Sequence, residues 1–363
     1  MSEELPRESK LASRHKALGS GLEDWNGMGT AWSYDSNADD EHNAVREDVG
    51  MFDMSPLKKV HIRGADSASV VDHLITRKME KIYTGKSAYG AILNEEGGVC
   101  DDAIIANNGD EYLLVHGSGE SMEMLQDSAQ GKNVDIEFDD DMHDISVQGP
   151  KSVELLNAHT PIDLLSLDYF HQQKTEIFGH PCTISRTGYS GERGYEIFVG
   201  ADSVCDVWDN LVGEGVMPCS FDSLDKVRVE AALLFFGYDM TADHSPWEVG
   251  LGWSVCRTKG DFRGKEAVFA REGNERFVMA GLVADYGEGL AGGETLSVDG
   301  QVIGVVNSPV WSERLQKSIA LVHIQKEFSM PGVKVVVSGE GVECAGEISA
   351  VPFYDPSKSN THA

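Results

Sequence analysis

The apolar and polar positions divide the chain into two regions of different character. Up to about residue 275, short runs that are apolar, or that alternate apolar and polar residues, are typical of β-strands. They occur at residues 59–64, 111–115, 134–138, 182–185 and 194–198. Segments with apolar residues at helical spacing separate them, at residues 66–74, 203–212 and 225–236. This interleaving in two blocks predicts α+β modules.

Beyond residue 275 the pattern is almost entirely that of β-strands. Residues 294–298 and 301–304 are strand-like and are joined by Asp299-Gly300, a dipeptide that favours a two-residue hairpin turn. Residues 333–337 form another strand-like run. We therefore expect one region over residues 1–275 and a small C-terminal β-barrel or sandwich over residues 276–363.

The composition fits a soluble protein with a large interior. The chain has 363 residues, of which 41% are hydrophobic, and this length suits two or three packed units. No uninterrupted apolar run reaches the roughly 18 residues that a membrane span needs. The N-terminal segment is polar and of mixed charge, unlike a secretion signal. We expect a cytoplasmic protein without a membrane partner.

The charge balance argues against several classes of ligand. Sixty acidic residues against thirty basic ones give a net charge of −30, which repels the phosphate backbone of nucleic acids. An anionic ligand would therefore need a pocket that is locally neutral or basic, because the negative net charge of the protein otherwise repels it. The six cysteines show no metal-ligand spacing. We expect them to be reduced packing residues, and we expect no metal site.

Common catalytic signatures are missing, but one segment stands out. The chain has no P-loop, no GxSxG or HExxH motif and no strand–GxGxxG–helix unit. Residues 88–102 instead read as a strand, a tight Glu-Gly-Gly turn and a return to Asp101 and Asp102. Side chains alternate along a strand, so one carboxylate would face a cavity and the other solvent or a capping partner. Judged from this segment alone, the alternative is that Asp101 and Asp102 are both ordinary turn residues without a catalytic role.

Blocks along the chain resemble the glycine-cleavage T-protein (aminomethyltransferase) family. Asn94-Glu95-Glu96-Gly97-Gly98 with Asp101-Asp102 is one such block. The others follow in family order at residues 45–46, 49–55, 148–150, 185–192, 194–196, 229–231, 237–240, 246–253, 264–267 and 317–321. The resemblance covers about residues 40–355. It implies an α+β fold with two ferredoxin-like modules around a central folate channel, a C-terminal β-barrel, and tetrahydrofolate as the cofactor, without metal, flavin or nucleotide.

The resemblance also implies roles for individual residues. Asp102 is similar to the family's catalytic carboxylate near N5 of tetrahydrofolate, and Tyr89 matches a position that lines the channel. Glu196 matches the acid that binds the amino and ring NH groups of the pterin, a task that suits a carboxylate because it accepts two charge-assisted hydrogen bonds. Tyr169 and Tyr189 match aromatic positions of the folate site, with ordinary core packing as the alternative.

The strand that the resemblance expects to contact folate departs from the family pattern at one position. Val115-His116 stands where the family usually has Val-Asn. Val115 is expected to contact folate. For His116 both a folate contact and a structural role stay open.

A second departure concerns the one-carbon donor. The family arginine in the segment before the Glu-Ala pair falls here on Leu224, and Arg228 and Lys226 are the candidates to replace it. Loss of that cation changes which donor the channel accepts. The change is similar to that in tetrahydrofolate-dependent demethylases, which implies transfer of a methyl group from a small sulfonium, amine or methoxy donor to N5.

An onium donor would rest on aromatic faces. Trp25, Trp32 and Trp247 are the candidates for this contact, with core packing as the alternative for each.

Three other functions stay open. The first is the aminomethyltransferase of glycine cleavage, which makes 5,10-methylene-tetrahydrofolate and ammonia from a lipoylated carrier protein. The second is a folate-binding module without catalysis. The third is the separate transferase part of a larger amine-oxidising system. The partner is therefore a small methylated substrate or a lipoylated carrier protein.

Overall fold

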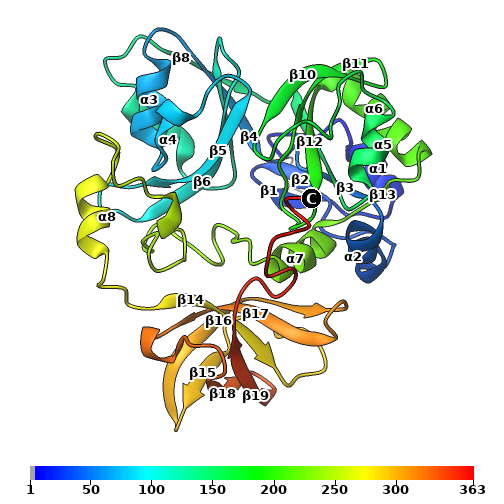
Figure 1. Ribbon diagram of the computed structural model, residues 1–363. Coiled ribbons are helices and arrows are strands. Elements are labelled where there is room, and N and C mark those ends of the chain that lie inside the picture. Colours follow the sequence, from blue (N-terminus) through cyan, green and yellow to red (C-terminus); the bar gives the residue numbers. More distant parts are fainter. Residues whose placement is uncertain (1–4) are drawn as a thin grey trace.

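The computed structural model describes residues 5–363. Two sheets, each carrying helices, lie side by side, and a β-barrel lies below them (Figure 1). The expected α+β architecture with a C-terminal barrel is thus confirmed.

The first sheet has five strands in the order β5-β6-β7-β4-β8. Their bounds are Lys58–Arg63 (β4), Lys86–Leu93 (β5), Val99–Asn107 (β6), Tyr112–His116 (β7) and Asp135–Asp139 (β8). Helices α3 (Ser67–Leu74) and α4 (Ser121–Ser128) pack on one face. The apolar positions of α3 are buried there against the strands, which leaves the other face free to meet the second sheet.

The second sheet has six strands in the order β10-β11-β12-β9-β3-β13. Their bounds are Gly50–Asp53 (β3), Met142–Gln148 (β9), Gln172–Ile177 (β10), His180–Ser185 (β11), Gly194–Gly200 (β12) and Met217–Pro218 (β13). Helices α1 (Ala12–Ala17), α5 (Ser152–Asn157) and α6 (Ala201–Gly213) belong to this unit. Trp208 of α6 is buried in the core beneath the sheet.

The remaining elements connect these units. They are α2 (Ala38–Glu47), α7 (Phe221–Glu230), α8 (Lys265–Arg271), the hairpin β1 (Glu23–Trp25) and β2 (Met28–Thr30), and short 3-10 helices at Met79–Lys81, Gly252–Ser254 and Lys326–Phe328.

The prediction of a helix over residues 225–236 is wrong at both ends, because α7 spans Phe221–Glu230 and so begins and ends earlier. Beyond it Ala232 adopts a left-handed conformation with φ 55°, which interrupts the helical hydrogen bonds. The carbonyl groups of Leu233 and Leu234 instead accept hydrogen bonds from the Tyr189 hydroxyl.

The C-terminal unit is a closed six-stranded barrel in the order β14-β17-β16-β15-β18-β19. The strands are Val278–Ala284 (β14), Thr295–Val298 (β15), Gln301–Ser312 (β16), Lys317–Ile324 (β17), Lys334–Gly339 (β18) and Val342–Ser349 (β19). The predicted hairpin is confirmed, since Asp299 and Gly300 join β15 to β16 with φ of 50° and 79°. Positive φ at both positions is what a two-residue turn of this kind requires.

The segment after β19 returns to the first region. The main-chain N–H of Tyr354 donates to the Glu230 carbonyl group at 3.0 Å, and the Thr361 hydroxyl donates to the Gly191 carbonyl group at 2.8 Å. Within residues 5–363 no helix is both long and apolar enough to cross a membrane. All six cysteines are free.

Candidate functional site

The turn between β5 and β6 places the two aspartates. Gly97 has φ +73°, and a side chain at Gly98 would collide with the Ala242 carbonyl oxygen, so both positions require glycine. Asn94 fixes the turn by accepting a hydrogen bond from the Gly98 N–H at 2.7 Å and donating to the Ala242 carbonyl group at 3.2 Å. The Asn-Glu-Glu-Gly-Gly block therefore sets where β6 begins.

Asp101 and Asp102 point to opposite faces of β6. Asp101 is fully buried and accepts hydrogen bonds from His116 Nδ1 at 2.9 Å and from the Ser121 hydroxyl at 2.6 Å, on the side of α4. Asp102 shares the other face with Ile104, which lines the cavity between the sheets. One carboxylate is thus capped and the other faces the second sheet, as strand alternation predicts.

The surroundings of Asp102 favour its protonated form. Burial and the negative charge of Asp101 raise its pKa to about 7, although its interaction with the Tyr89 hydroxyl works in the opposite direction. The charge of Asp102 in turn raises the pKa of Tyr189 further, beyond the effect of burial. Asp102, Tyr89 and Tyr189 therefore lie close together, with Tyr189 coming from the second unit. A carboxyl group with a pKa near neutrality is suited to accept and release a proton.

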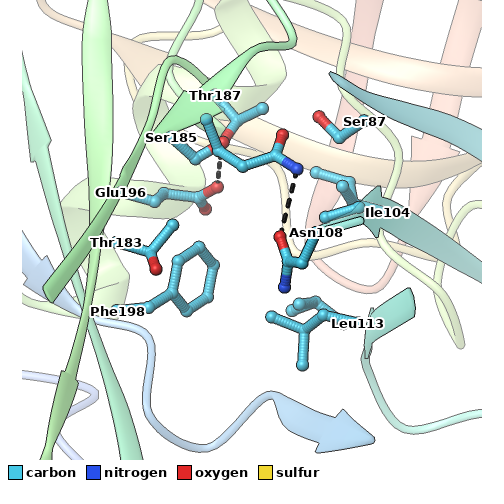
Figure 2. A pocket seen from close by; sticks show the side chains of 12 residues that line it. Ser87, Ile104, Asn108, Leu113, Thr183, Ser185, Thr187, Glu196 and Phe198 are labelled. Atoms are coloured by element: carbon cyan, nitrogen blue, oxygen red, sulfur yellow. Dashed lines mark hydrogen bonds between the residues drawn. The ribbon is translucent and has the colours of Figure 1, made fainter. Parts of the chain in front are cut away.

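A small cavity lies between the two sheets (Figure 2), and one of its walls is formed by Ile104, which lies two residues after Asp102 on the same face of β6. Its walls are partly apolar and partly polar, and they comprise Ser87, Ile104, Ala106, Asn108, Leu113, Val115, Gln172, Thr183, Ser185, Thr187, Glu196 and Phe198. Val115, for which a folate contact was predicted, is among these lining residues.

Glu196 is the acidic group of this cavity. It is buried on β12 and accepts a hydrogen bond from the Thr187 hydroxyl, which Figure 2 shows as a dashed line. Burial raises the pKa of Glu196, although Thr187 works in the opposite direction. Burial and the charge of Glu196 raise the pKa of Tyr169, so this phenol lies near Glu196. The predicted folate-site residues Glu196, Tyr169 and Val115 are thus brought together.

His116 lies on the opposite face of the sheet from Val115. Its imidazole is buried, its Nδ1 pairs with Asp101, and its Nε2 has no hydrogen-bond partner among residues 5–363. The alternative of a folate contact therefore needs correction, because strand alternation directs His116 to α4 and away from the cavity. The geometry assigns His116 to holding Asp101 in place.

The helix α7 carries the residues around the missing family arginine. Leu224 is buried in an apolar cluster. Arg228 is buried and donates to Asp225 and Asp239, both at 2.6 Å, and to the Ser308 hydroxyl at 2.9 Å. Lys226 pairs with Asp39 at 2.7 Å. Both candidate replacements for the arginine thus have acidic partners within the protein.

The three predicted donor-site tryptophans have aromatic or apolar neighbours. Trp25 and Trp32 both contact the ring of Phe221, with ring centroids 5.2 and 5.5 Å apart. They pack against the same apolar cluster as Tyr189. The Trp247 indole N–H donates to the Val268 carbonyl group at 2.7 Å. A role in donor binding stays a prediction for all three.

Two further residues near the site were missed by the sequence analysis. Trp253 is 62% exposed and its ring stacks on Tyr89, with ring centroids 5.8 Å apart. Asp144 is fully buried on β9, next to β12, and neither of its carboxylate oxygens has a hydrogen-bond partner among residues 5–363. No local pattern marks either residue, since Trp253 lies in a short 3-10 helix and Asp144 stands at a polar position of a strand that alternates apolar and polar residues.

The described residues contain no group of three or more His, Cys, Asp or Glu side chains placed to hold a metal ion.

Comparisons with known proteins agree with this geometry. A family model described as the GCVT N-terminal domain matches residues 11–259, and one described as the Glycine cleavage T-protein C-terminal barrel domain matches residues 278–355. The chain is 43% identical to the "Heme-dependent oxidative N-demethylase gamma subunit" of Ectopseudomonas mendocina, over 98% of each chain. It is 31% identical to an "Aminomethyltransferase" of Streptomyces avermitilis, over 99% of this chain and 100% of the other.

The fold is also that of a solved structure. The glycine cleavage system aminomethyltransferase T from Bartonella henselae superimposes with a TM-score of 0.90 at 23% identity, covering 97% of this chain and 99% of that chain. The chain therefore belongs to the glycine-cleavage T-protein family, whose members act as transferases of one-carbon groups.

Proposed function

We propose that this protein transfers a one-carbon unit to tetrahydrofolate, and that the unit comes from the oxidation of a methylated amine by a partner. The observation that carries the first part is the placement of Asp102. It lies in a setting that raises its pKa to about 7, on the sheet face that looks toward Glu196.

The residues of the cavity fit a reduced pterin. Ile104, Val115 and Phe198 offer apolar surface to the ring faces, and Glu196 offers a carboxylate to the amino-pyrimidinone edge. The raised pKa of buried Glu196 is typical of an acid that lacks a cationic partner and has capacity to accept hydrogen bonds. Because the cavity is small, its side chains must move apart to admit the ring.

When bound, tetrahydrofolate supplies N5, a nucleophilic amine. Glu196 then orients the pterin by its polar edge, and the two sheets exclude water from its faces. The negative charge of Asp102 stabilises the positive charge that develops on N5 as the new bond forms, and Asp102 then takes up the proton that N5 loses. Tyr89 lowers the pKa of Asp102 and so favours the ionised form that accepts the proton.

The oxidative origin of the carbon rests on the similarity to the N-demethylase gamma subunit. Oxidation of an N-methyl group by a partner, followed by hydrolysis, gives formaldehyde and the demethylated amine. Condensation of the formaldehyde with N5 and N10 of tetrahydrofolate releases one water and gives 5,10-methylene-tetrahydrofolate. The small methylated amine is then the substrate of the partner. Direct methyl transfer to N5 would instead give 5-methyl-tetrahydrofolate.

Product analysis tests this proposal. The purified chain is incubated with tetrahydrofolate and either ¹³C-formaldehyde or a panel of methylated sulfonium, amine and methoxy compounds, and the folates are identified by mass spectrometry. We expect labelled methylene-tetrahydrofolate to form faster than without protein. Formation of 5-methyl-tetrahydrofolate from any donor alone would contradict the oxidative route. Exchange with a lipoylated carrier protein and ammonia would favour the aminomethyltransferase reaction instead.

A further inference from the structure

Trp253 is a large aromatic side chain that stands in solvent and contacts the group around Asp102. It is 62% exposed, whereas the other five tryptophans are buried or half-buried. Its ring stacks on the ring of Tyr89, with centroids 5.8 Å apart and planes inclined by 21°. Stacked aromatic pairs are favourable beyond the area that they bury. The contact therefore restrains the Tyr89 ring, although most of the indole lies in water.

The stack lies at the free edge of the first sheet. β5 is the outermost strand in the order β5-β6-β7-β4-β8, and within residues 5–363 no further strand of that sheet lies beyond it. The short 3-10 helix Gly252–Ser254 packs against β5 instead, and Trp253 is its central residue. Tyr89 points to the same face of β5 as Ser87, which lines the cavity between the sheets. Trp253 thus packs on Tyr89 where, in the interior of a sheet, a side chain of a neighbouring strand would do so.

Two contacts hold Trp253 in this place. The main-chain N–H of Cys256, which follows the 3-10 helix, donates to the Thr76 carbonyl group at 3.0 Å. The Arg77 guanidinium lies over the indole, 5.6 Å from the ring centroid, a distance at which a cation is attracted to an aromatic face. The stem of Arg77 passes Gly90, where an added side chain would meet its Cγ atom at 2.8 Å. The segment before β5 therefore helps to fix the indole.

Tyr89 connects Trp253 to Asp102. On the paired strands Tyr89 lies opposite Ile104 and Asp102 lies opposite Ala91, so Tyr89 and Asp102 are diagonal neighbours on one face. Diagonal neighbours in a sheet are about 7–8 Å apart, which is within reach of an aromatic side chain. Besides burial, the charge of Asp102 raises the pKa of Tyr89, as this geometry requires. The orientation of the Tyr89 ring therefore decides how its hydroxyl meets Asp102.

We propose that Trp253 is a positioning residue of the transfer reaction, which keeps the Tyr89 hydroxyl beside Asp102. This inference rests on the proposed function, and it extends the site to a side chain outside the cavity. Among residues 5–363, Trp253 is the only ring that stacks on Tyr89, so without the indole the phenol is free to turn away. The proton acceptor then loses a neighbour that favours its ionised form. Because Trp253 is exposed, its removal leaves no buried cavity, and an effect on the reaction is separable from one on folding.

The titration of Asp102 tests this role without relying on turnover. Aspartate labelled with ¹³C at its carboxyl group is incorporated into the full chain, and the Asp102 signal is assigned by its absence in Asp102→Asn. Asp102 is faced by Asp101 from its own strand, by Tyr89 from β5 and by Tyr189 from the second unit. In Trp253→Ala only the contact with Tyr89 is released. Since Tyr89 lowers the pKa of Asp102, we expect the midpoint to rise from about 7 by about 0.5–1 pH unit, as for the loss of one hydrogen bond.

Three further variants complete the comparison. Tyr89→Phe should give the same shift, and Trp253→Ala should add nothing to it in the double variant, since the indole acts through the Tyr89 hydroxyl. Trp253→Phe keeps a ring and should restore the wild-type midpoint. Met330→Ala is the control, because it removes a side chain of the barrel region that is 70% exposed, and it should change nothing. In Trp253→Ala the value of kcat/KM at pH 7 should fall about 2- to 5-fold, because Asp102 is ionised in fewer molecules.

Two results would overturn the inference. A midpoint that stays or falls in Trp253→Ala would show that the indole does not act by orienting Tyr89. A shift of equal size in the Tyr89→Phe background would show that it acts independently of that hydroxyl. If the wild type showed no turnover with tetrahydrofolate while the midpoints shifted as expected, the proposed function would fail, but the connection from Trp253 through Tyr89 to Asp102 would stand.

Discussion

Asp101 and Asp102 are consecutive on β6, yet one carboxyl group is held among the helices of its unit and the other faces the opposing sheet. The Oδ1 atom of Asp101 accepts a hydrogen bond from the main-chain N–H of Asp102 at 2.9 Å, while His116 and Ser121 hold its Oδ2 atom. Asp101 thereby fixes the strand at the point where Asp102 projects from it. Its negative charge also raises the pKa of Asp102, in addition to the effect of burial.

The pH profile should follow the titration of Asp102. As the proton acceptor it must be ionised, so kcat/KM should rise with pH through a midpoint near its pKa of about 7. Tyr89→Phe removes the group that lowers this pKa, so the midpoint should move to higher pH. Initial rates between pH 5.5 and 9 provide the measurement. A profile that is flat across this range would argue against Asp102 as the base.

Glu196→Gln should weaken folate binding. The substitution replaces a carboxylate by a neutral amide, so hydrogen bonds to the pterin lose their charge, and we expect a dissociation constant about 10- to 100-fold higher. Thr187→Ser keeps the hydroxyl that donates to Glu196 and serves as the control. Fluorescence titration with tetrahydrofolate measures both variants. Unchanged affinity in Glu196→Gln would show that the pterin binds elsewhere.

Asp144→Asn should stabilise the protein at alkaline pH. Burial and the charge of Glu196 raise the pKa of Asp144 well above its ordinary value, although Lys59 works in the opposite direction. The folded state therefore holds this proton more tightly than the unfolded state, and the wild type loses stability as pH rises above the unfolded pKa of about 3.9. Urea unfolding should show a larger gain for the variant at pH 8 than at pH 5. An equal gain at both pH values would mean that Asp144 does not titrate in this way.

Glu230→Gln should destabilise the fold. Glu230 is buried, accepts hydrogen bonds from Arg46 and His42, and also accepts one from Ser312 of the barrel at 2.5 Å. Although burial opposes it, these groups lower the pKa of Glu230 to about 2. Removing its charge leaves Arg46 less compensated, and we expect a loss of about 3–5 kcal/mol at pH 7.

The pH dependence of this loss has a definite sign. Because the folded pKa of Glu230 lies below the unfolded value of about 4.3, its contribution is complete above pH 5 and disappears as pH falls from about 4 to 2. The difference between the variant and the wild type in urea unfolding should therefore shrink over that range. A difference that does not change with pH would point to lost packing alone.

The sequence predicted the features that depend on local patterns. Alternation along β6 placed Asp101 and Asp102 on different faces, and Asp299-Gly300 identified the barrel hairpin. The family resemblance supplied Glu196 and Val115, which line one cavity.

The features that were missed depend on contacts between distant segments. The end of α7 is an exception, because it is set locally: Ala232 adopts φ 55°, and the N–H groups of Ala232 and Leu233 donate to the carbonyl groups of Val229 and Arg228. For His116 the sequence left a folate contact and a structural role both open, and its hydrogen bond to Asp101 distinguishes them. The periodicity of apolar residues predicts helices and strands, but it does not identify which distant side chains come into contact.

The central claim is that Asp102 performs the chemistry while Glu196 holds the pterin. The most direct test is to measure turnover and the dissociation constant of tetrahydrofolate side by side in Asp102→Asn, which has nearly the same shape but no charge. We predict that turnover falls about 100-fold or more, as expected when a general base is lost, with folate affinity within about threefold of the wild type. Turnover at the wild-type rate with folate bound would contradict the account.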